Sequence, residues 1–362
     1  MNIALVHNLC PSSRSNDDDQ PPSEPDPCKN SDLYAEWDDP QTISAVAEAL
    51  SAKHTVTLID ADLDAYSKLR YLKPDLVFNM AEGLYGAGRE AQIPAMLDML
   101  SIPYTGSDPV TLGICLDKQR TKEILSWHKI PTPKFYVVSA IKDLPQRPHY
   151  PLMVKPLFEG SSKGITNKSL VFNRVELKRQ VEFVFSNYGE SVLIEEFLPG
   201  REFTVALLGN GSSLTVLPIV ELDFKVLPLG ALPIYSYEAK WEWDKEEDPL
   251  QIFSCPAVLN DILEKKIADM CIHTFNVFKC RDWCRIDVRL DEQGTPNIIE
   301  LNPLPGILPR PEQNSCFPKA ARAAGLNYTD MILSVVNAAQ SRMNLKQEKI
   351  EAAWTNKAGQ AI

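Results

Sequence analysis

Residues 282–306, DWCRIDVRLDEQGTPNIIELNPLPG, constrain the fold more than any other part of this chain of 362 residues. Two short runs rich in isoleucine, valine and leucine flank a polar segment that contains Gly294, a pattern typical of an antiparallel β-hairpin. If residues 292–295 form the turn, Asp291 faces Pro296. Every further pair along the two strands then follows from that register.

The same register places two acidic side chains opposite each other. Asp287 lies opposite Glu300, and Arg285 lies opposite Asn302. Because side chains alternate between the faces of a strand, all four project from one face. Directly opposed Cβ atoms are roughly 4.5 to 5.5 Å apart, so the two carboxylates repel each other unless a cation lies between them. Two carboxylates and an amide oxygen suit Mg²⁺, whereas the alternative is a solvated hairpin face with a surface ion pair.

The composition narrows the classes of protein to which the chain can belong. Its length favours two or three domains, and its 44% apolar and 23% charged residues are ordinary for a globular protein. The net charge of −11 argues against a nucleic-acid partner, because phosphate backbones are bound by basic surfaces. No run of about 18 apolar residues occurs, so we expect no membrane partner and a cytoplasmic location. The 8 cysteines lack paired CxxC spacing, which favours buried thiols in a reducing compartment.

The first part of the chain alternates between predicted strands and helices, the order typical of a parallel sheet. Residues 11–32 are rich in proline, serine and aspartate and predict a surface loop, which either covers a substrate or is a passive insertion. The third predicted strand ends at Asn79, and Glu82 and Gly83 follow it. Ligands of open α/β sheets gather at the carboxyl ends of strands, so Glu82 could contact a substrate. A polar loop residue or a helix N-terminal charge is the alternative.

Two further segments combine a strand with groups that could bind a nucleotide. Lys155 lies on a predicted strand that runs into residues 160–164, GSSKG, whose N–H groups and hydroxyls could surround phosphate oxygens. Residues 192–198, VLIEEFL, predict a strand edge that could bind a flat ring such as adenine. Considered alone, the first segment could be an ordinary hairpin turn and the second a solvent-facing edge. Residues 227–256 predict an exposed loop that crosses an open site.

Lys118, Lys155 and the motifs GSSKG, EEFLPGREF, YEAKW, RIDV and ELNPLPG occur in an order that resembles the ATP-grasp ligases, and within them the D-alanine:D-alanine ligase family. The resemblance extends from residue 75 to residue 332. It implies an α/β ATP-grasp fold with an N-terminal parallel α/β domain, a small central α+β lid domain and a C-terminal α+β domain. We expect these domains in residues 1–116, 117–197 and 198–342, followed by a polar tail in residues 343–362.

The resemblance also implies which residues bind ATP and metal ions. ATP would lie between the central and C-terminal domains together with Mg²⁺, as two ions, for which Mn²⁺ is an alternative. The nucleotide would be held by Lys118, Lys155, Ser161, Ser162, Gly164, Glu195, Glu196, Phe197, Leu198, Glu202 and Lys240. The metal ligands would be Asp287, Glu300 and Asn302. Arg285 would stabilise the transferred phosphoryl group and the later oxyanion, and Ser161 and Lys240 would act with it at the γ-phosphate.

Ligases of this kind form an amide from a carboxylate and an amine by way of an acyl phosphate. We therefore predict an ATP-dependent carboxylate–amine ligase that acts on amino acids or a small carboxylic acid and could form a homodimer. The substrates would be contacted by Glu82, Gly83, Arg89, Asn302, Gly306 and Ser315.

The chain departs from D-alanine:D-alanine ligases mainly around the substrate. Where those enzymes have a glycine-rich loop after the first strand, this chain has HNLCPSSRSNDDD, and where they have His-Gly it has Glu82-Gly83. Their Ser-Leu pair corresponds at best to Ser315-Cys316. We therefore expect substrates other than two D-alanines. A genuine D-alanine:D-alanine ligase is the first alternative, and a non-catalytic ATP-binding module is the second, although the intact set of predicted metal ligands argues against the second.

Overall fold

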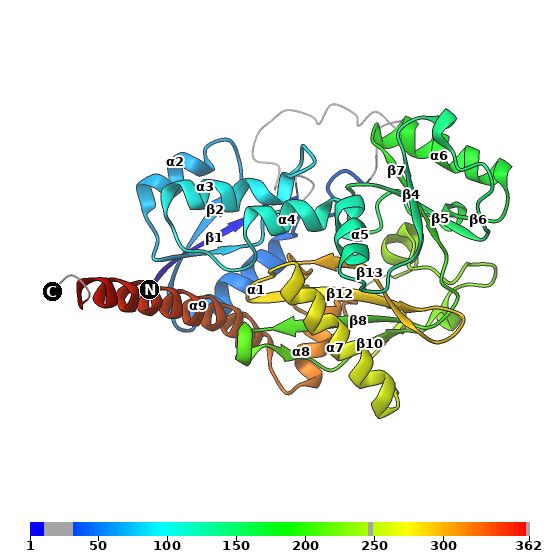
Figure 1. Ribbon diagram of the computed structural model, residues 1–362. Coiled ribbons are helices and arrows are strands. Elements are labelled where there is room, and N and C mark those ends of the chain that lie inside the picture. The colour runs from blue at the N-terminus through cyan, green and yellow to red at the C-terminus, as the bar shows by residue number, and fades with distance from the viewer. Residues whose placement is uncertain (11–31, 245–248, 360–362) are drawn as a thin grey trace.

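The computed structural model describes residues 1–10, 32–244 and 249–359 of the chain. Within these ranges the strands form a parallel sheet near the N-terminus, a second sheet in residues 135–196, and a longer antiparallel sheet below and between them (Figure 1). Each sheet falls within one of the predicted domains, whose boundaries stay predictions. The predicted loop over residues 11–32 lies, apart from Asp32, outside the described residues.

The N-terminal sheet is parallel and has the order β2-β1-β3. Its strands are β1 (Asn2–His7), β2 (Thr55–Asp60) and β3 (Leu76–Asn79), and the helices of this part are α1 (Pro40–Ser51), α2 (Ala65–Leu72), the 3-10 turn η2 (Arg89–Ala91), α3 (Gln92–Leu100) and α4 (Pro109–Leu116). Strand β1 lies between β2 and β3, and helices cover both faces of the sheet. Almost all of its side chains are therefore buried, which explains its continuous apolar sequence. The predicted alternation of strands and helices is confirmed.

The second sheet is antiparallel and has the order β4-β7-β5-β6. Its elements are α5 (Lys118–Trp127), β4 (Phe135–Val138), η3 (Ile141–Asp143), β5 (Leu152–Pro156), η4 (Asn167–Ser169), β6 (Leu170–Val171), α6 (Arg174–Tyr188) and β7 (Val192–Glu196). Helix α6 buries one face of this sheet, where Val181 and Val184 pack with Val154 and Ile194. The other face is therefore available to the cavity described below.

The third sheet has the order β11-β10-β8-β12-β13, with β9 paired to β8. Its elements are β8 (Glu202–Leu208), η5 (Gly211–Ser213), β9 (Thr215–Val216), β10 (Val220–Leu222), η6 (Phe224–Val226), the π-helical turn η7 (Glu238–Trp243), β11 (Phe253–Ser254), α7 (Asp261–Val277), β12 (Trp283–Leu290), β13 (Pro296–Asn302), α8 (Cys316–Ala323) and α9 (Tyr328–Gly359). Residues 227–256 thus contain short ordered elements, although they were predicted to be a loop.

The alternation of side chains along β12 separates the core from the functional face. Ile286 and Val288 pack with Phe275 of α7, in a cluster that buries one side of the sheet. Arg285 and Asp287 therefore project from the opposite side, where they line a cavity. Packing of the apolar side chains of β12 against α7 therefore fixes the direction in which its polar side chains point.

The hairpin of β12 and β13 confirms the predicted pairing near the site and corrects it near the turn. Asp287 pairs with Glu300, as predicted. A bulge follows Asp287, so that Leu290, and not Asp291, pairs with Pro296. The extra residue lies on β13, so Ile299 and Glu300 both line the cavity, whereas Ile298 packs in the core with Val288.

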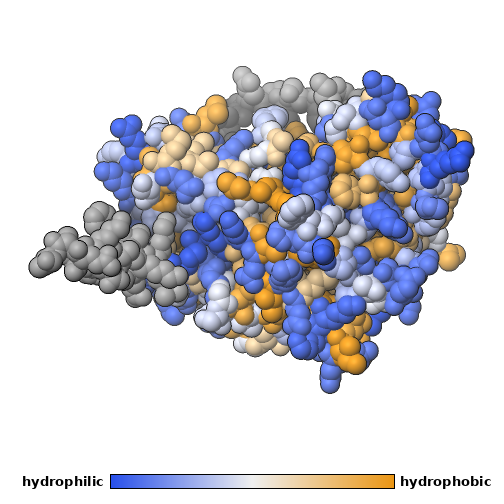
Figure 2. Space-filling view, in the orientation of Figure 1, coloured by the Kyte–Doolittle hydropathy of each residue, from blue (hydrophilic) through white to orange (hydrophobic). Residues whose placement is uncertain are grey.

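On the face shown in Figure 2, hydrophilic side chains cover much of the surface and hydrophobic ones form smaller areas among them. No helix in the described ranges is both long enough and apolar enough to cross a membrane.

Candidate active site

A cavity of about 1460 Å³ lies where the three sheets meet. It is larger than the roughly 300 to 1,000 Å³ typical of a site for one small ligand, so a nucleotide and further substrates could fit together. Most of the predicted site residues line it: Glu82, Lys118, Lys155, Ser161, Ser162, Glu195, Glu196, Phe197, Leu198, Glu202, Lys240, Arg285, Asp287, Glu300, Asn302, Gly306 and Ser315. Gly83, Arg89 and Gly164 do not line it.

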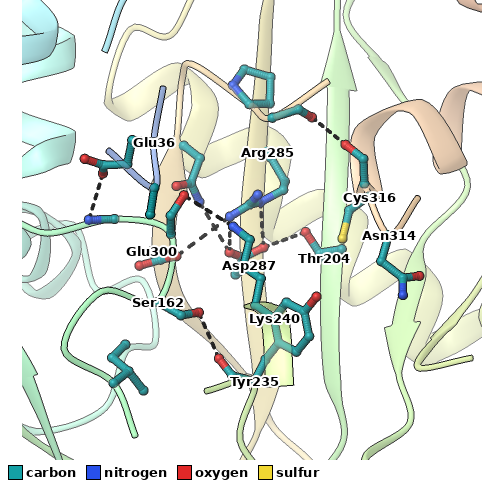
Figure 3. A pocket seen from close by; sticks show the side chains of 18 of the residues that line it. Glu36, Ser162, Thr204, Tyr235, Lys240, Arg285, Asp287, Glu300, Asn314 and Cys316 are labelled. Carbon is teal, nitrogen blue, oxygen red and sulfur yellow. Dashed lines mark hydrogen bonds and ion pairs between the residues drawn. The ribbon is translucent and has the colours of Figure 1, made fainter. Parts of the chain in front are cut away.

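The hairpin contributes a cluster of charged groups that point toward one another (Figure 3). Arg285 lies within 3.0 Å of a carboxylate oxygen of Asp287 and within 3.8 Å of one of Glu300. The side chain of Asn302 donates to Asp287 over 3.3 Å, and the hydroxyl of Thr204 on β8 donates to the other oxygen of the same carboxylate. The predicted set is therefore brought together.

The electrostatics of this cluster fit a divalent cation. Burial raises the pKa of Asp287 to about 6 against the opposing effect of Arg285, and repulsion from Glu300 adds to the increase. Burial also disfavours ionised Glu300, but Lys118, Lys155 and Arg285 together lower its pKa. No cluster of three or more histidine, cysteine, aspartate or glutamate side chains suited to a metal ion occurs in the described part of the chain. An ion here would thus rely on two carboxylates, the Asn302 amide oxygen and oxygens of the nucleotide.

Two of the predicted phosphate-binding lysines are held in place by protein groups. Lys118, at the start of α5, donates to the backbone carbonyl of Glu159. Lys155 on β5 forms an ion pair of 2.6 Å with Glu195, whose second oxygen lies 2.6 Å from Lys122. Lys122 was missed by the sequence analysis. The signal was present, because Lys118 and Lys122 are four residues apart on one helix and so lie on the same face.

The predicted adenine-binding edge needs correction at Glu195. Strand β7 lies between β4 and β5, so it is an interior strand, and the backbone of Glu195 pairs with both Phe135 and Met153. Its carboxylate is only 2% exposed and is engaged by the two lysines. Phe197 and Leu198, which follow the strand and line the cavity, are therefore the better candidates for contact with a flat ring.

Glu202 is held by an arginine that the sequence analysis also missed. The guanidinium of Arg289 lies 2.6 Å from a Glu202 carboxylate oxygen and 4.6 Å from the ring centroid of Phe197. Arg289 lies on the same face of β12 as Arg285 and Asp287. The two-residue period of a strand could therefore have predicted that it lines the site.

The glycine-serine loop and the segment around η7 close over the cavity from two sides. The hydroxyl of Ser162 donates to the carbonyl of Tyr235 over 2.9 Å (Figure 3). Lys240 donates to the hydroxyl of Ser161, and Trp241 donates to its carbonyl, both over 3.3 Å. Lys240 and Ser161, both predicted to act at the γ-phosphate, therefore lie next to each other.

Gly164 supports this loop sterically and does not reach the cavity. Its φ is +70°, and a Cβ atom there would lie 2.5 Å from Pro156 and 2.9 Å from Tyr188. Larger side chains are therefore excluded, which explains the glycine without any contact to a ligand.

Arg89 was predicted to contact the substrate, but the structure assigns it to a buried ion pair. Its guanidinium donates to both carboxylate oxygens of Glu36 over 2.8 Å and to the carbonyl of Phe158 over 2.9 Å. Glu36 also accepts from the N–H of Gly160 over 2.9 Å. Arg89 therefore joins the N-terminal part to the glycine-serine loop, and it is not free to receive a substrate carboxylate. Glu36 was missed, and nothing local in the sequence links it to a partner 53 residues away.

Gly83 also has a structural place. Its N–H donates to Asn8 and its carbonyl accepts from Trp37, both over 2.9 Å. With a φ of +71°, and with the carbonyl oxygen of Arg89 only 2.7 Å from where a Cβ atom would be, only glycine fits.

The far end of the cavity is formed by the loop before α8. The hydroxyl of Ser315 donates to the carbonyl of Gly306 over 2.9 Å and accepts from the N–H of Leu308, so it stabilises the loop. The side-chain amide of Asn314 donates to both carboxylate oxygens of Asp244 over 2.8 Å, which ties this loop to η7.

Comparison with known proteins identifies the family of this chain. The family model described as D-ala D-ala ligase C-terminus matches residues 127–337. The D-alanine–D-alanine ligase of Bordetella petrii is 33% identical over 298 residues, which cover 82% of this chain and 85% of that protein. That of Pelotomaculum thermopropionicum is 30% identical over 319 residues, covering 85% and 93%. The uncharacterized protein y4sG of Sinorhizobium fredii is 33% identical over 307 residues, covering 83% and 87%.

Solved structures show the same fold. The crystal structure of D-alanine–D-alanine ligase from Bacillus anthracis complexed with ATP matches with a TM-score of 0.69 at 22% identity, covering 96% of this chain and 99% of that one. The predicted ATP-grasp fold class is therefore confirmed.

Proposed function

The chain belongs to the D-alanine–D-alanine ligase family of ATP-grasp proteins, and from this premise we propose how its cavity joins a carboxylate to an amine. It is an ATP-dependent carbon–nitrogen ligase. The observation that carries the proposal is the meeting of the hairpin cluster with Lys118, Lys155 and Lys240 in one cavity. Cations and carboxylates in that arrangement suit a nucleotide triphosphate bound with a divalent metal ion.

We assign the nucleotide to the side of the cavity nearest the second sheet. Phe197 and Leu198 would contact the adenine, Glu202 the ribose, and the three lysines the phosphates. Asp287, Glu300 and Asn302 would hold Mg²⁺, which supplies charge neutralisation for the phosphates when it is bound. Ser161 and Ser162 lie in a loop that Lys240 and Tyr235 already contact, so the loop and η7 can exclude water together.

The reaction follows from these positions. A carboxylate oxygen of the first substrate attacks the γ-phosphorus, the bond to the β-phosphate oxygen breaks, and ADP leaves with its electron pair. The amine of the second substrate then attacks the carbonyl carbon of the acyl phosphate, loses a proton, and displaces inorganic phosphate. Arg285 is placed to stabilise the transferred phosphoryl group and the tetrahedral oxyanion, because preorganised donors act where charge develops.

The substrates are proposed to be amino acids or a small carboxylic acid. A genuine D-alanine:D-alanine ligase is the second candidate, favoured by relatives of that name at 30% and 33% identity. A matrix of amino acids and small acids, scored for ATP-dependent phosphate release, tests both. Release with D-alanine alone at the lowest KM would establish the second candidate, and release with no pair would reject the ligase assignment. The homodimer stays a prediction.

The pH dependence of ATP use should report on Lys240. Burial and the adjacent Arg285 lower the pKa of Lys240 to about 8. Only the protonated amine attracts phosphate, so kcat/KM for ATP is expected to be constant below about pH 8 and to fall above it. Lys240→Arg should move this alkaline limb upward, since an arginine keeps its charge to about pH 12. An unchanged limb in Lys240→Arg would assign it to another group.

Glu82 provides a test of the substrate side. It follows β3, lines the cavity, and is not one of the residues predicted to bind the nucleotide. Glu82→Ala is expected to raise KM for the amino-acid substrate about tenfold, as loss of one charge-assisted contact does, and to leave KM for ATP within about twofold. Steady-state kinetics with each substrate varied in turn measure both, and Glu264→Ala, an exposed site on α7, is the control. An unchanged substrate KM would make Glu82 a loop residue only.

A further inference from the structure

One wall of the cavity is acidic. It is formed by Asp38, from the segment that precedes α1, by Glu82, which follows β3, and by Glu90 in η2. In the described part of the chain, none of these three carboxylates forms a hydrogen bond or an ion pair with a protein group. Glu90 is 9% exposed, so a buried ionisable side chain borders the cavity without a hydrogen-bonding partner.

Two of the neighbouring cations are already engaged with other carboxylates. Arg89 lies 2.8 Å from Glu36 and 3.7 Å from Glu159. Lys163 lies 3.3 Å from the same oxygen of Glu36 and also contacts Glu159. These two cations therefore match Glu36 and Glu159. Lys118 donates to the backbone carbonyl of Glu159 and acts to lower the pKa of Glu90, so the three carboxylates of the acidic wall face one further cation among the described residues.

The excess charge has an energetic consequence. Burial and repulsion from Glu90 and Glu36 raise the pKa of Glu82 well above its ordinary value. Burial, with a contribution from Glu36, raises the pKa of Glu90 to about 7, and burial raises that of Asp38. Buried carboxylates are costly unless paired, so a ligand that brings positive charge to this wall removes a cost that the protein alone carries.

We propose that the acidic wall binds a positively charged side chain of the amino-acid substrate, so that the enzyme acts on a basic amino acid. The inference rests on the proposed function. The bound group is not the reacting amine, because a nucleophile must lose its proton, whereas an amine among three carboxylates stays protonated. A basic side chain brings a second cation beyond the α-ammonium that every amino acid carries, so binding at this wall makes substrate preference depend on side-chain charge.

The test compares substrates that differ only in side-chain charge. Lysine and norleucine, ornithine and norvaline, and arginine and citrulline, as both enantiomers, are each paired with a mixture of common amino acids, and ADP formation by the full-length protein is measured at pH 7. The cationic member of at least one pair is expected to have a KM about tenfold below that of its neutral partner. Glu90→Gln should reduce this ratio to about twofold or less while KM for ATP stays unchanged, and Glu264→Gln, at an exposed site, should keep the ratio.

A second measurement separates this inference from the ligase assignment. The thermal midpoint of the protein with MgATP is recorded with lysine and with norleucine, and with the other two matched pairs. A cationic member that raises the midpoint more than its neutral partner, with the difference lost in Glu90→Gln, supports the acidic wall even if no pair releases ADP. Turnover that prefers neutral amino acids such as D-alanine would overturn the inference and leave the ligase assignment standing. Absence of any charge-dependent difference in both measurements would also overturn it.

Discussion

Glu300→Gln is expected to leave the fold intact and to reduce ADP formation by at least about 10² to 10³-fold. The substitution keeps the shape of the side chain but removes one of the two charges that face each other across β12 and β13. The remaining partner, Asp287, would then have to hold a divalent cation with Asn302 alone. Coupled ADP release measures the loss, and far-UV circular dichroism checks the fold.

The matched control for this variant is Glu292→Gln, in the exposed turn of the same hairpin. It makes the same chemical change outside the cavity and should keep full activity. The Mg²⁺ concentration for half-maximal activity should rise in Glu300→Gln and stay unchanged in the control. Normal turnover by Glu300→Gln would remove the metal assignment and, with it, the proposed placement of the phosphates.

Glu195→Gln is expected to lower the free energy of unfolding by about 3 to 5 kcal/mol. Its carboxylate lies 2.6 Å from Lys122 and 2.6 Å from Lys155, and it is only 2% exposed. Removing the shared negative charge leaves two buried ammonium groups without a counter-charge. Urea unfolding at pH 7 measures the effect, with Glu196→Gln as the control, because the adjacent side chain is exposed.

The same ion pairs predict how stability varies with pH. Burial disfavours ionised Glu195, but Lys122 and Lys155 outweigh it and lower the pKa of Glu195 to about 2. A carboxyl whose pKa is lower in the folded state stabilises the protein above its unfolded pKa, and this contribution is lost as the pH falls toward about 2. The difference in unfolding free energy between wild type and Glu195→Gln should therefore shrink below about pH 4.5. A difference that stays constant from pH 7 to pH 3 would contradict the buried pairing.

The hairpin shows how far local patterns determine a site. The two-residue period of the strands and the composition of the turn were enough to place Asp287 opposite Glu300, because each depends on only a few neighbouring residues. The bulge after Asp287 was not predicted, since its position depends on how β12 packs between β8 and β13. The pairing at the site survived because the shift lies on the turn side of it.

The nucleotide side shows the opposite case. Residues 192–198 contain the predicted apolar strand, but the sequence could not show that β7 has a neighbour on each side. That neighbour relation is what turned Glu195 from an edge residue into the centre of a buried ion-pair cluster with Lys122 and Lys155. Glu195 therefore supports Lys155, which is predicted to bind phosphate, instead of contacting the nucleotide itself.

The sequence by itself determined the order of elements, the ATP-grasp family and most of the residues that line the cavity, because motifs, strand period and turn residues are properties of short segments. Only the tertiary structure decided which charges are already matched. Arg89 and Glu36 are 53 residues apart, and their pairing keeps Arg89 from contacting the substrate. It also leaves Asp38, Glu82 and Glu90 without an ion pair to any residue that the structure describes. Ion pairing depends on distance in space and on burial, and neither can be read from spacing along the chain.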